Sequence, residues 1–392
     1  MELAIDITKE YGLVLEGGGA RGAYQIGAWH ALQEAGVKIN AVAGTSVGAL
    51  NGALICMGDL QAAENIWKTI SHSKVMEVDE EKVAALFDGS AKLTDWIQAV
   101  FQYTSEGGAD ITPLKELIAD AVDEQKIKEG TIAFYLHTFS LDEMKELDVD
   151  VKEIEDGLLP DFLLASAYLP VFKHEKLHGK SYMDPGIINN VPLDSLVNRG
   201  YKDIIILRIF GPGRYRQVEL TDDVTVYSVE PRVNLGNILN FDSKKSINNM
   251  KIGYYDTQRM LYNLSGRIYY IDEKEKECYY LKQLIEIDEQ VMEYVNNAYT
   301  ASSNKSVYRE YTEETLDAIA QVLRLKKYDY KDLYLSILEA TAKLFKIQKY
   351  NIYTVEELIT AIREKEIQEP LPPFVYIILD RLPKEEETEE QK

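Results

Sequence analysis

The sequence predicts an α/β fold of three layers, with helices on both faces of a mostly parallel central sheet, followed by a helical C-terminal region. Between residues 11 and 57, an apolar run, a glycine-containing turn and a helix-like stretch occur twice in succession. Strands buried on both faces have such continuous apolar runs, and strands that alternate with helices pair in parallel. After about residue 273, apolar residues recur at helical spacing, which predicts packed helices.

The elements of the predicted sheet follow one another in chain order. We expect strands over 11–15 and 37–43, each leading through a tight turn into a helix, over 23–35 and 47–57. Further along we expect helices over about 60–130 with breaks at 88–90 and 106–108, a strand over 131–139, a helix over 157–169, strands within 201–210 and over 224–231, and a helix over 243–264.

The chain divides into three predicted regions. Residues 1–272 form the α/β domain, 273–383 are mostly helical, and 384–392 (KEEETEEQK) form an acidic, disordered tail. Within the helical region, Thr354 and Glu357 have the spacing of a capping box, in which the two side chains satisfy backbone N–H groups at a helix start.

The overall charge limits the possible partners. The 392 residues have a formal net charge of −22, which argues against nucleic acid and against simple adsorption to anionic membranes. A lipid substrate and transient, peripheral membrane contact remain compatible with this charge. The charge does not indicate an oligomeric state.

The cysteines and the apolar segments bear on location. Two distant cysteines, Cys56 and Cys278, indicate a reducing compartment, and we expect both to be buried, structural residues. The charged start MELAIDITKE does not resemble a signal peptide, so we expect a cytoplasmic protein. Residues 39–58 contain no charge, but small and polar residues interrupt them, and we interpret them as a buried strand, turn and helix.

The first glycine-rich turn, GGGARG, contains Gly17, Gly18, Gly19, Arg21 and Gly22. Its spacing matches a dinucleotide fingerprint, but no acidic residue lies between Glu34 and Asp59, where a ribose hydroxyl would need one. The alternative is an oxyanion site, because backbone N–H groups before a helix can stabilise developing negative charge. Arg21 either adds positive potential or ties the loop down, and a structural ion pair is the other interpretation.

The second turn, GTSVG, places Ser46 between Gly44 and Gly48. This spacing between a strand and a helix is typical of a nucleophile elbow, which exposes a serine hydroxyl on a strained turn. The other interpretation is a glycine-rich corner that has no chemistry. A serine nucleophile requires a base and oxyanion donors, and GGGARG would supply the donors.

The base has two kinds of candidate. Five histidines are present without a surrounding motif: His30, His72, His137, His174 and His178. Asp184 lies in SYMDPGIINNVP, where Asp-Pro-Gly is also an ordinary turn sequence.

Four blocks together resemble the patatin-like phospholipases: GGGARG, GTSVG, ASAYLPVF (165–172) and YMDPGIINNVP, over roughly residues 10–210. The resemblance implies a Ser–Asp dyad that hydrolyses fatty-acyl esters of phospholipids or lysophospholipids without a metal or organic cofactor. It assigns the nucleophile to Ser46, the base to Asp184 and the oxyanion hole to the GGGARG loop.

One departure concerns the Asp184-Pro185-Gly186 motif, because the family usually has glycine directly after the aspartate. Proline has no N–H, so an aspartate oriented by that group would lose it. A catalytically weakened family member and a nucleotide-binding module therefore stay as alternatives.

Overall fold

The computed structural model describes residues 1–77, 108–170, 172–173, 175–300, 305–366 and 370–383. The chain separates into two compact units, Glu2–Leu261 and Tyr262–Lys392 with Met1. The expected breaks at 88–90 and 106–107 and the expected tail at 384–392 lie outside the described residues.

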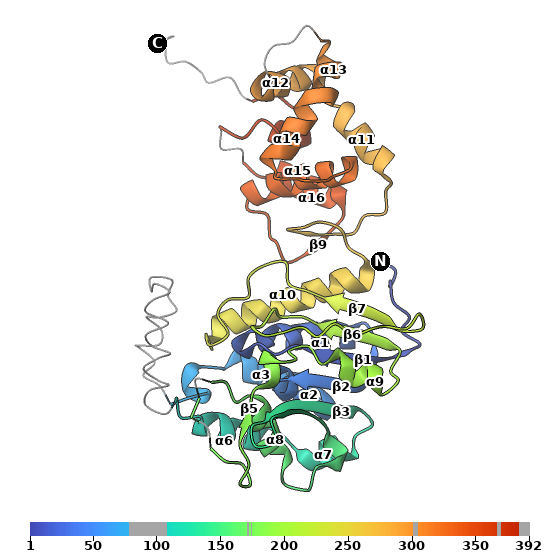
Figure 1. The fold of residues 1–392 in the computed structure, drawn as a ribbon. Helices are drawn as coiled ribbons and strands as arrows, with labels where there is room; N and C mark the ends of the chain where they lie inside the picture. The colour runs from blue at the N-terminus through green and yellow to red at the C-terminus, as the bar shows by residue number, and fades with distance from the viewer. Residues whose placement is uncertain (78–107, 171, 174, 301–304, 367–369, 384–392) are drawn as a thin grey trace. The chain divides into compact units, whose positions relative to one another are not determined.

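The described part of the first unit is built on a seven-stranded sheet with the order β4-β3-β2-β1-β6-β7, in which β5 also pairs with β3 (Figure 1). The pairs β1–β2, β2–β3, β1–β6 and β6–β7 are parallel, whereas β4 and β5 pair with β3 in antiparallel fashion. The strands are β1 (Glu10–Leu15), β2 (Lys38–Thr45), β3 (Ala133–Ser140), β4 (Lys145–Asp150), β5 (Tyr182–Met183), β6 (Asp203–Leu207) and β7 (Thr225–Val229).

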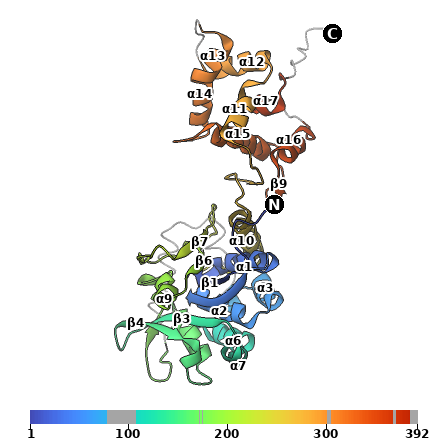
Figure 2. The ribbon, with the colours of Figure 1, turned by 90° about the vertical axis from the view of Figure 1, so that its right-hand side faces the viewer.

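Helices cover both faces of this sheet, as the apolar runs require. Helix α9 packs on one face, where Leu193 and Leu196 join a buried cluster that includes Val14, Ala43 and Ile206. Figure 2 shows α9 and α1 on opposite sides of the sheet. The helices of this unit are α1 (Ala23–Glu34), α2 (Val47–Met57), α3 (Leu60–Lys68), α6 (Thr112–Ala121), α7 (Glu124–Glu129), α8 (Leu159–Ser166), α9 (Leu193–Asn198) and α10 (Ser243–Tyr262).

The second unit is mostly helical around its own apolar core. Two short parallel strands, β8 (Tyr270–Ile271) and β9 (Ile352–Tyr353), accompany the helices. Thr354 and Glu357 form the predicted capping box at the start of α16. Its helices are α11 (Glu277–Ile285), α12 (Glu289–Tyr299), α13 (Val307–Glu310), a π-helical segment (Tyr311–Thr315), α14 (Leu316–Val322), α15 (Tyr330–Leu344), α16 (Val355–Arg363) and α17 (Val375–Leu379).

The fold class predicted from the sequence is confirmed: a mostly parallel sheet is flanked by helices and followed by a helical region. The uncharged segment 39–58 forms most of β2 together with α2. No helix among the described residues combines the length and the apolar character needed to cross a bilayer. The antiparallel strands β4 and β5 were not predicted.

Candidate active site

Ser46 occupies the turn between β2 and α2 in a strained conformation, with φ of 55° and ψ of −127°. The tight packing of this turn excludes side chains at its two glycines. A Cβ on Gly44 would collide with the backbone of Gly48, and a Cβ on Gly48 would collide with the carbonyl of Leu15. Strained non-glycine residues are frequent at reactive positions, and a positive φ at a serine between a strand and a helix is typical of a nucleophile elbow.

Ser166 holds the Ser46 turn in place. The Ser46 N–H donates a hydrogen bond of 2.8 Å to Ser166 Oγ, which lies at the C-terminal end of α8. Sequence reasoning gave Ser166 no role, although the block ASAYLPVF that contains it supported the resemblance. This bond fixes the serine backbone and leaves the Ser46 hydroxyl free for other contacts.

Asp184 follows β5 directly and caps a 3₁₀ helix, Pro185–Ile187. Its Oδ1 accepts a hydrogen bond of 2.8 Å from the Gly186 N–H, and its own N–H donates to the Tyr168 carbonyl at 2.8 Å. Pro185 occupies the first position of the helix, where a missing N–H costs little. The carboxyl is therefore oriented by the residue after the proline.

The Asp184 carboxyl is buried, with 4% of the residue exposed. Burial raises its pKa to about 6, against the smaller, opposite influence of hydrogen bonding from the Ser46 hydroxyl and the Gly186 N–H. Within the described residues, no donor meets hydrogen-bond geometry at Oδ2. The structure thus brings Asp184 to Ser46 and leaves one carboxyl oxygen without a hydrogen-bond donor among the described residues.

Two glycines of the GGGARG loop, Gly18 and Gly19, line the same cavity as Ser46 and Asp184. The Gly17 N–H is occupied, because it donates to the Asn190 carbonyl at 3.1 Å. No acceptor is present for the N–H groups of Gly18 and Gly19 among the residues that the structure describes. The N–H groups of Gly18 and Gly19, which line the same cavity as Ser46, thus differ from that of Gly17 in having no acceptor among the described residues.

Arg21 anchors this loop through backbone carbonyls. Its guanidinium donates to the carbonyls of Gly236 (2.7 Å), Ile209 (3.3 Å) and Phe210. Its partners are thus not the carboxylates that the ion-pair interpretation required. Gly22 serves packing, since a Cβ there would lie 2.5 Å from Val47 Cγ2 at the start of α2.

Two further residues that sequence reasoning missed, Glu16 and Asn190, connect the loops. The buried Glu16 carboxylate accepts hydrogen bonds from the backbone N–H groups of Ile209 (2.7 Å) and Phe210 (2.9 Å) and pairs with Arg208 (3.0 Å). Asn190 Nδ2 donates to the Gly17 carbonyl at 3.0 Å. Asn190 lies in the block YMDPGIINNVP and Glu16 directly precedes GGGARG, but the partners of both are distant in the chain, so these motifs did not reveal what the two side chains bind.

Two cavities meet at Ser46. The first, of about 410 Å³, is lined by Ser46, Asp184, Gly18 and Gly19 together with loop residues that include Arg214. The second is apolar, has a volume of about 90 Å³ and shares Ser46, Gly19 and Leu169 with the first.

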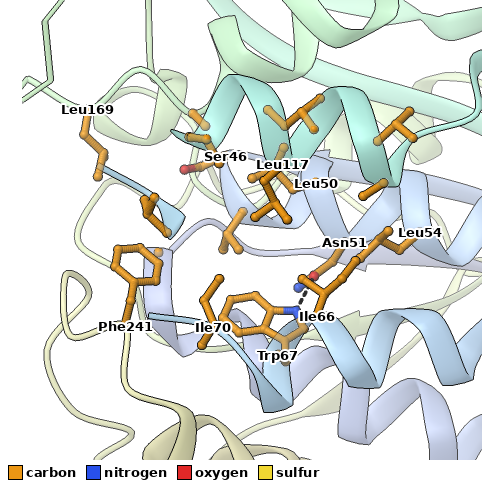
Figure 3. A pocket seen from close by; sticks show the side chains of 18 of the residues that line it. Ser46, Leu50, Asn51, Leu54, Ile66, Trp67, Ile70, Leu117, Leu169 and Phe241 are labelled. Atoms are coloured by element: carbon orange, nitrogen blue, oxygen red, sulfur yellow. Dashed lines mark hydrogen bonds between the residues drawn. The ribbon is translucent and has the colours of Figure 1, made fainter. Parts of the chain in front are cut away.

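Figure 3 shows Ser46 beside the side chains of this second cavity, with the Trp67 indole N–H bonded to Asn51 Oδ1 at 3.0 Å. Leucine and isoleucine side chains line most of the remainder, with Trp67 and Phe241. Such a surface favours contact with apolar groups of a ligand beside the serine.

None of the four described histidines lines either cavity, and His174 lies outside the described residues. His137 is buried between two carboxylates of β4. Burial lowers its pKa, but hydrogen bonds to Asp148 and Glu146 outweigh this and raise it to about 9, so the ring is protonated at neutral pH. The others have contacts of their own: His30 with Glu64, His178 with Asp161, and His72 with the Phe241 ring.

The cysteines lie away from these cavities. Cys56 is buried, and burial raises the pKa of its thiol, which keeps it protonated and unreactive. Cys278 is exposed in the second unit, so the expected burial is wrong for this residue.

The fold and this site define an α/β protein that places a strained serine beside a buried carboxyl group. Residues 13–197 match the family described as patatin-like phospholipase, so this segment of the chain is similar to that family.

The chain is 28% identical over 205 residues to neuropathy target esterase sws of Drosophila melanogaster, which covers 50% of this chain and 13% of that protein. It is 59% identical over 46 residues to lysophospholipase nte1 of Aspergillus terreus, which covers 12% of this chain and 3% of that protein. The matched segments thus span a small part of these relatives. Among solved structures, VipD from Legionella pneumophila aligns with a TM-score of 0.42 and 15% identity, covering 94% of this chain and 90% of that one.

Proposed function

We propose that this protein is a serine acyl hydrolase that cleaves fatty-acyl esters of phospholipids or lysophospholipids, with Ser46 as nucleophile and Asp184 as base. The observation that carries the proposal is the pairing of the strained Ser46 with Asp184, a buried carboxyl whose pKa is raised to about 6. A carboxylate of that pKa is mostly ionised at neutral pH and is a stronger base than an ordinary aspartate.

The proposed reaction begins with attack of Ser46 Oγ on the ester carbonyl carbon, while Asp184 takes the hydroxyl proton. The tetrahedral oxyanion accepts hydrogen bonds from the Gly18 and Gly19 N–H groups, which have no acceptor among the described residues. The C–O bond to the alcohol then breaks, and Asp184 returns the proton to the leaving oxygen. An acyl-serine and a free alcohol result.

The second half of the reaction repeats these steps with water. Asp184 takes a proton from the water that attacks the acyl carbonyl, and the tetrahedral intermediate collapses to release the fatty acid. Ser46 leaves as the alcohol after receiving the proton from Asp184. The reaction consumes one water and requires no metal or organic cofactor.

The substrate class is supported by the cavities and by one relative. The apolar cavity beside Ser46 suits an acyl chain, and the wider cavity suits the alcohol portion of the ester. The Aspergillus terreus relative is named a lysophospholipase, and its short match is 59% identical. We therefore expect lysophospholipids among the substrates.

A fluorophosphonate probe and a lysophospholipid hydrolysis assay test the proposal together. The wild type should be labelled at Ser46 and should release fatty acid, whereas Ser46→Ala should do neither while keeping its circular dichroism spectrum. Ser228→Ala, at an exposed serine of β7, is the matched control and should behave as the wild type.

Three outcomes would contradict the proposal. Hydrolysis that persists in Ser46→Ala would assign the nucleophile to another residue. A folded wild type that neither labels nor hydrolyses would indicate a catalytically weakened binding protein. Stabilisation by nucleotides in a thermal-shift assay, without esterase activity, would favour the nucleotide-binding alternative.

A further inference from the structure

The segment from Arg208 to Arg216 contains three arginines, two of which have carboxylate partners. Arg208 Nε pairs with Glu16 at 3.0 Å. Arg216 pairs with both Glu146 and Asp194 at 2.7 Å. These two guanidinium groups are accounted for by interactions within the fold.

Arg214, the third of them, differs from the other two. Across the described residues, no carboxylate or carbonyl accepts a hydrogen bond from its guanidinium, and the side chain is exposed. It lines the same cavity as Ser46 and Asp184. With 65 acidic against 43 basic residues in the chain, acidic partners for such a cation are abundant. A cation without one at this cavity is therefore available to a ligand.

The backbone of Arg214 is fixed relative to the candidate base. The Arg214 N–H donates to the Gly186 carbonyl at 3.1 Å, and its carbonyl accepts from the Asn190 N–H at 2.8 Å. The preceding Gly213 has φ of 149°, and a Cβ there would collide with the Gly186 carbonyl. The arginine is thus carried on a loop that is bound directly to the Asp184 turn.

We propose that Arg214 binds the phosphate of the substrate headgroup while the ester lies at Ser46. This inference rests on the proposed function and makes Arg214 a determinant of specificity for phosphate-containing esters. The guanidinium group is planar and always charged, and it can bind two phosphate oxygens at once.

The arrangement of the two cavities agrees with the order of groups in a lysophospholipid. The acyl chain, the ester and the phosphate follow one another along that molecule. The apolar cavity, Ser46 and the cavity lined by Arg214 follow one another in the same order, because the two cavities share Ser46, Gly19 and Leu169. A phosphate would therefore reach the arginine when the acyl chain occupies the apolar side.

The test compares two esters that have the same acyl chain, octanoyl-lysophosphatidylcholine and 1-octanoylglycerol, both below their micelle concentrations. The quantity measured is the ratio of their kcat/KM values in the full chain. Arg214→Gln should lower this ratio about 10-fold or more, mainly through a higher KM for the phosphate ester, because a charge-assisted hydrogen bond is lost. Arg214→Lys should give an intermediate ratio.

Arg216→Gln is the matched control, since it removes the same charge two residues away, from a side chain that does not line the cavity. Its ratio should equal that of the wild type. A ratio that stays unchanged in Arg214→Gln, or that falls equally in Arg216→Gln, overturns the inference and leaves the proposed function intact.

Two other outcomes also decide the matter. If the wild type hydrolyses neither ester, the proposed function and this inference both fall. Inorganic phosphate distinguishes a headgroup site from a site for free phosphate. Phosphate could inhibit octanoylglycerol hydrolysis in the wild type and not in Arg214→Gln, while the ratio of the two esters is the same in both proteins. That result would assign the arginine to free phosphate and overturn the inference.

Discussion

Two buried carboxylates, one in each unit, show how differently the molecule uses the same group. Glu339 of α15 is 2% exposed and accepts backbone hydrogen bonds from Arg267 (2.9 Å), Ile268 (2.8 Å) and Tyr269 (2.7 Å). Asp184 is 4% exposed and accepts a single backbone bond, from Gly186, at one oxygen. Both carboxyl groups are buried away from solvent, but only Glu339 accepts hydrogen bonds from three backbone donors.

The difference separates a structural carboxylate from the one that we propose to be the base. Desolvation destabilises a carboxylate unless hydrogen bonds replace the lost water. Glu339 receives that replacement and closes the loop before β8. Asp184 does not, and its pKa rises to about 6 because of burial. A buried carboxyl group that lacks hydrogen-bond donors is therefore a better candidate for a catalytic role than one that is only buried.

The largest expected effect follows from exchanging each carboxylate for its amide. Asp184→Asn should reduce lysophospholipid hydrolysis by about 10⁴-fold, because an amide cannot accept the serine proton. Glu339→Gln should hydrolyse at the wild-type rate in its folded form. Fatty-acid release by both purified variants measures the contrast. Equal losses in the two variants would remove the distinction between them.

A second prediction concerns the backbone donors of the glycine loop. Gly18→Ala should lower kcat by about 10²–10³-fold, because displaced N–H groups no longer stabilise the oxyanion. The added Cβ would meet Ile209 Cδ1 at 2.8 Å, the flexible end of a side chain, so the fold should persist. Steady-state kinetics with a thermal unfolding control test this. A folded variant with wild-type kcat would assign the glycines to another purpose.

The same two amide variants should shift stability in opposite directions. The folded pKa of Asp184 lies above its ordinary 3.8, so its contribution to stability is present below pH 4 and is lost as the pH rises through about 6. At pH 8, Asp184→Asn should therefore be more stable than the wild type by up to about 3 kcal/mol, and the gain should shrink toward pH 4.

Urea unfolding followed by tryptophan fluorescence measures this gain, because Trp29, Trp67 and Trp96 all belong to the first unit. Glu339→Gln should instead destabilise the second unit by about 2 kcal/mol, through weaker hydrogen bonds to its three backbone donors. Circular dichroism follows the helices of both units, so a change in its transition that tryptophan fluorescence does not show belongs to the second unit. A wild type more stable than Asp184→Asn at pH 8 would contradict the assigned pKa.

The smallest effects are expected from the histidines. With Asp184 as base, kcat/KM should fall about tenfold per pH unit below about 6, since the carboxylate must be ionised to act. A histidine base would titrate nearby, so substitution decides between them. Single replacement of His30, His72, His137, His174 or His178 by glutamine should leave hydrolysis by the folded protein largely intact. The His174 variant is the most informative, and a loss there as large as in Asp184→Asn would indicate a triad.

Much of the fold could be predicted because its signals are local. The strands 11–15 and 37–43 are continuous apolar runs, and the structure forms β1 and β2 there. The strand β4 (KELDVD) escaped prediction because it lies at the edge of the sheet and is rich in charged residues, without an apolar run. The two-residue strand β5 is too short to carry a periodic signal.

The residues of the candidate site likewise fall into those that the sequence indicated and those that it did not. Ser46, Asp184 and the glycines stand in recognisable motifs, so the sequence pointed to them. Ser166, Glu16 and Asn190 act through hydrogen bonds to residues more than a hundred positions away, which no local pattern encodes. The sequence does not reveal which N–H group orients the Asp184 carboxyl, so the missing N–H of Pro185 could have mattered. In the structure the orienting group is the N–H of Gly186.

The hydrogen bonds of Asn190 restrict the motion of the segments around the candidate site. Its carbonyl accepts from Gly17, its side chain donates back to Gly17, and its N–H donates to Arg214, whose own N–H is bound to Gly186. Three segments distant in the chain are thus held by one short network, and none can leave its place without breaking bonds of the others. Amide hydrogens of Gly17, Asn190 and Arg214 should therefore exchange with solvent in a single cooperative opening, as one local unfolding unit.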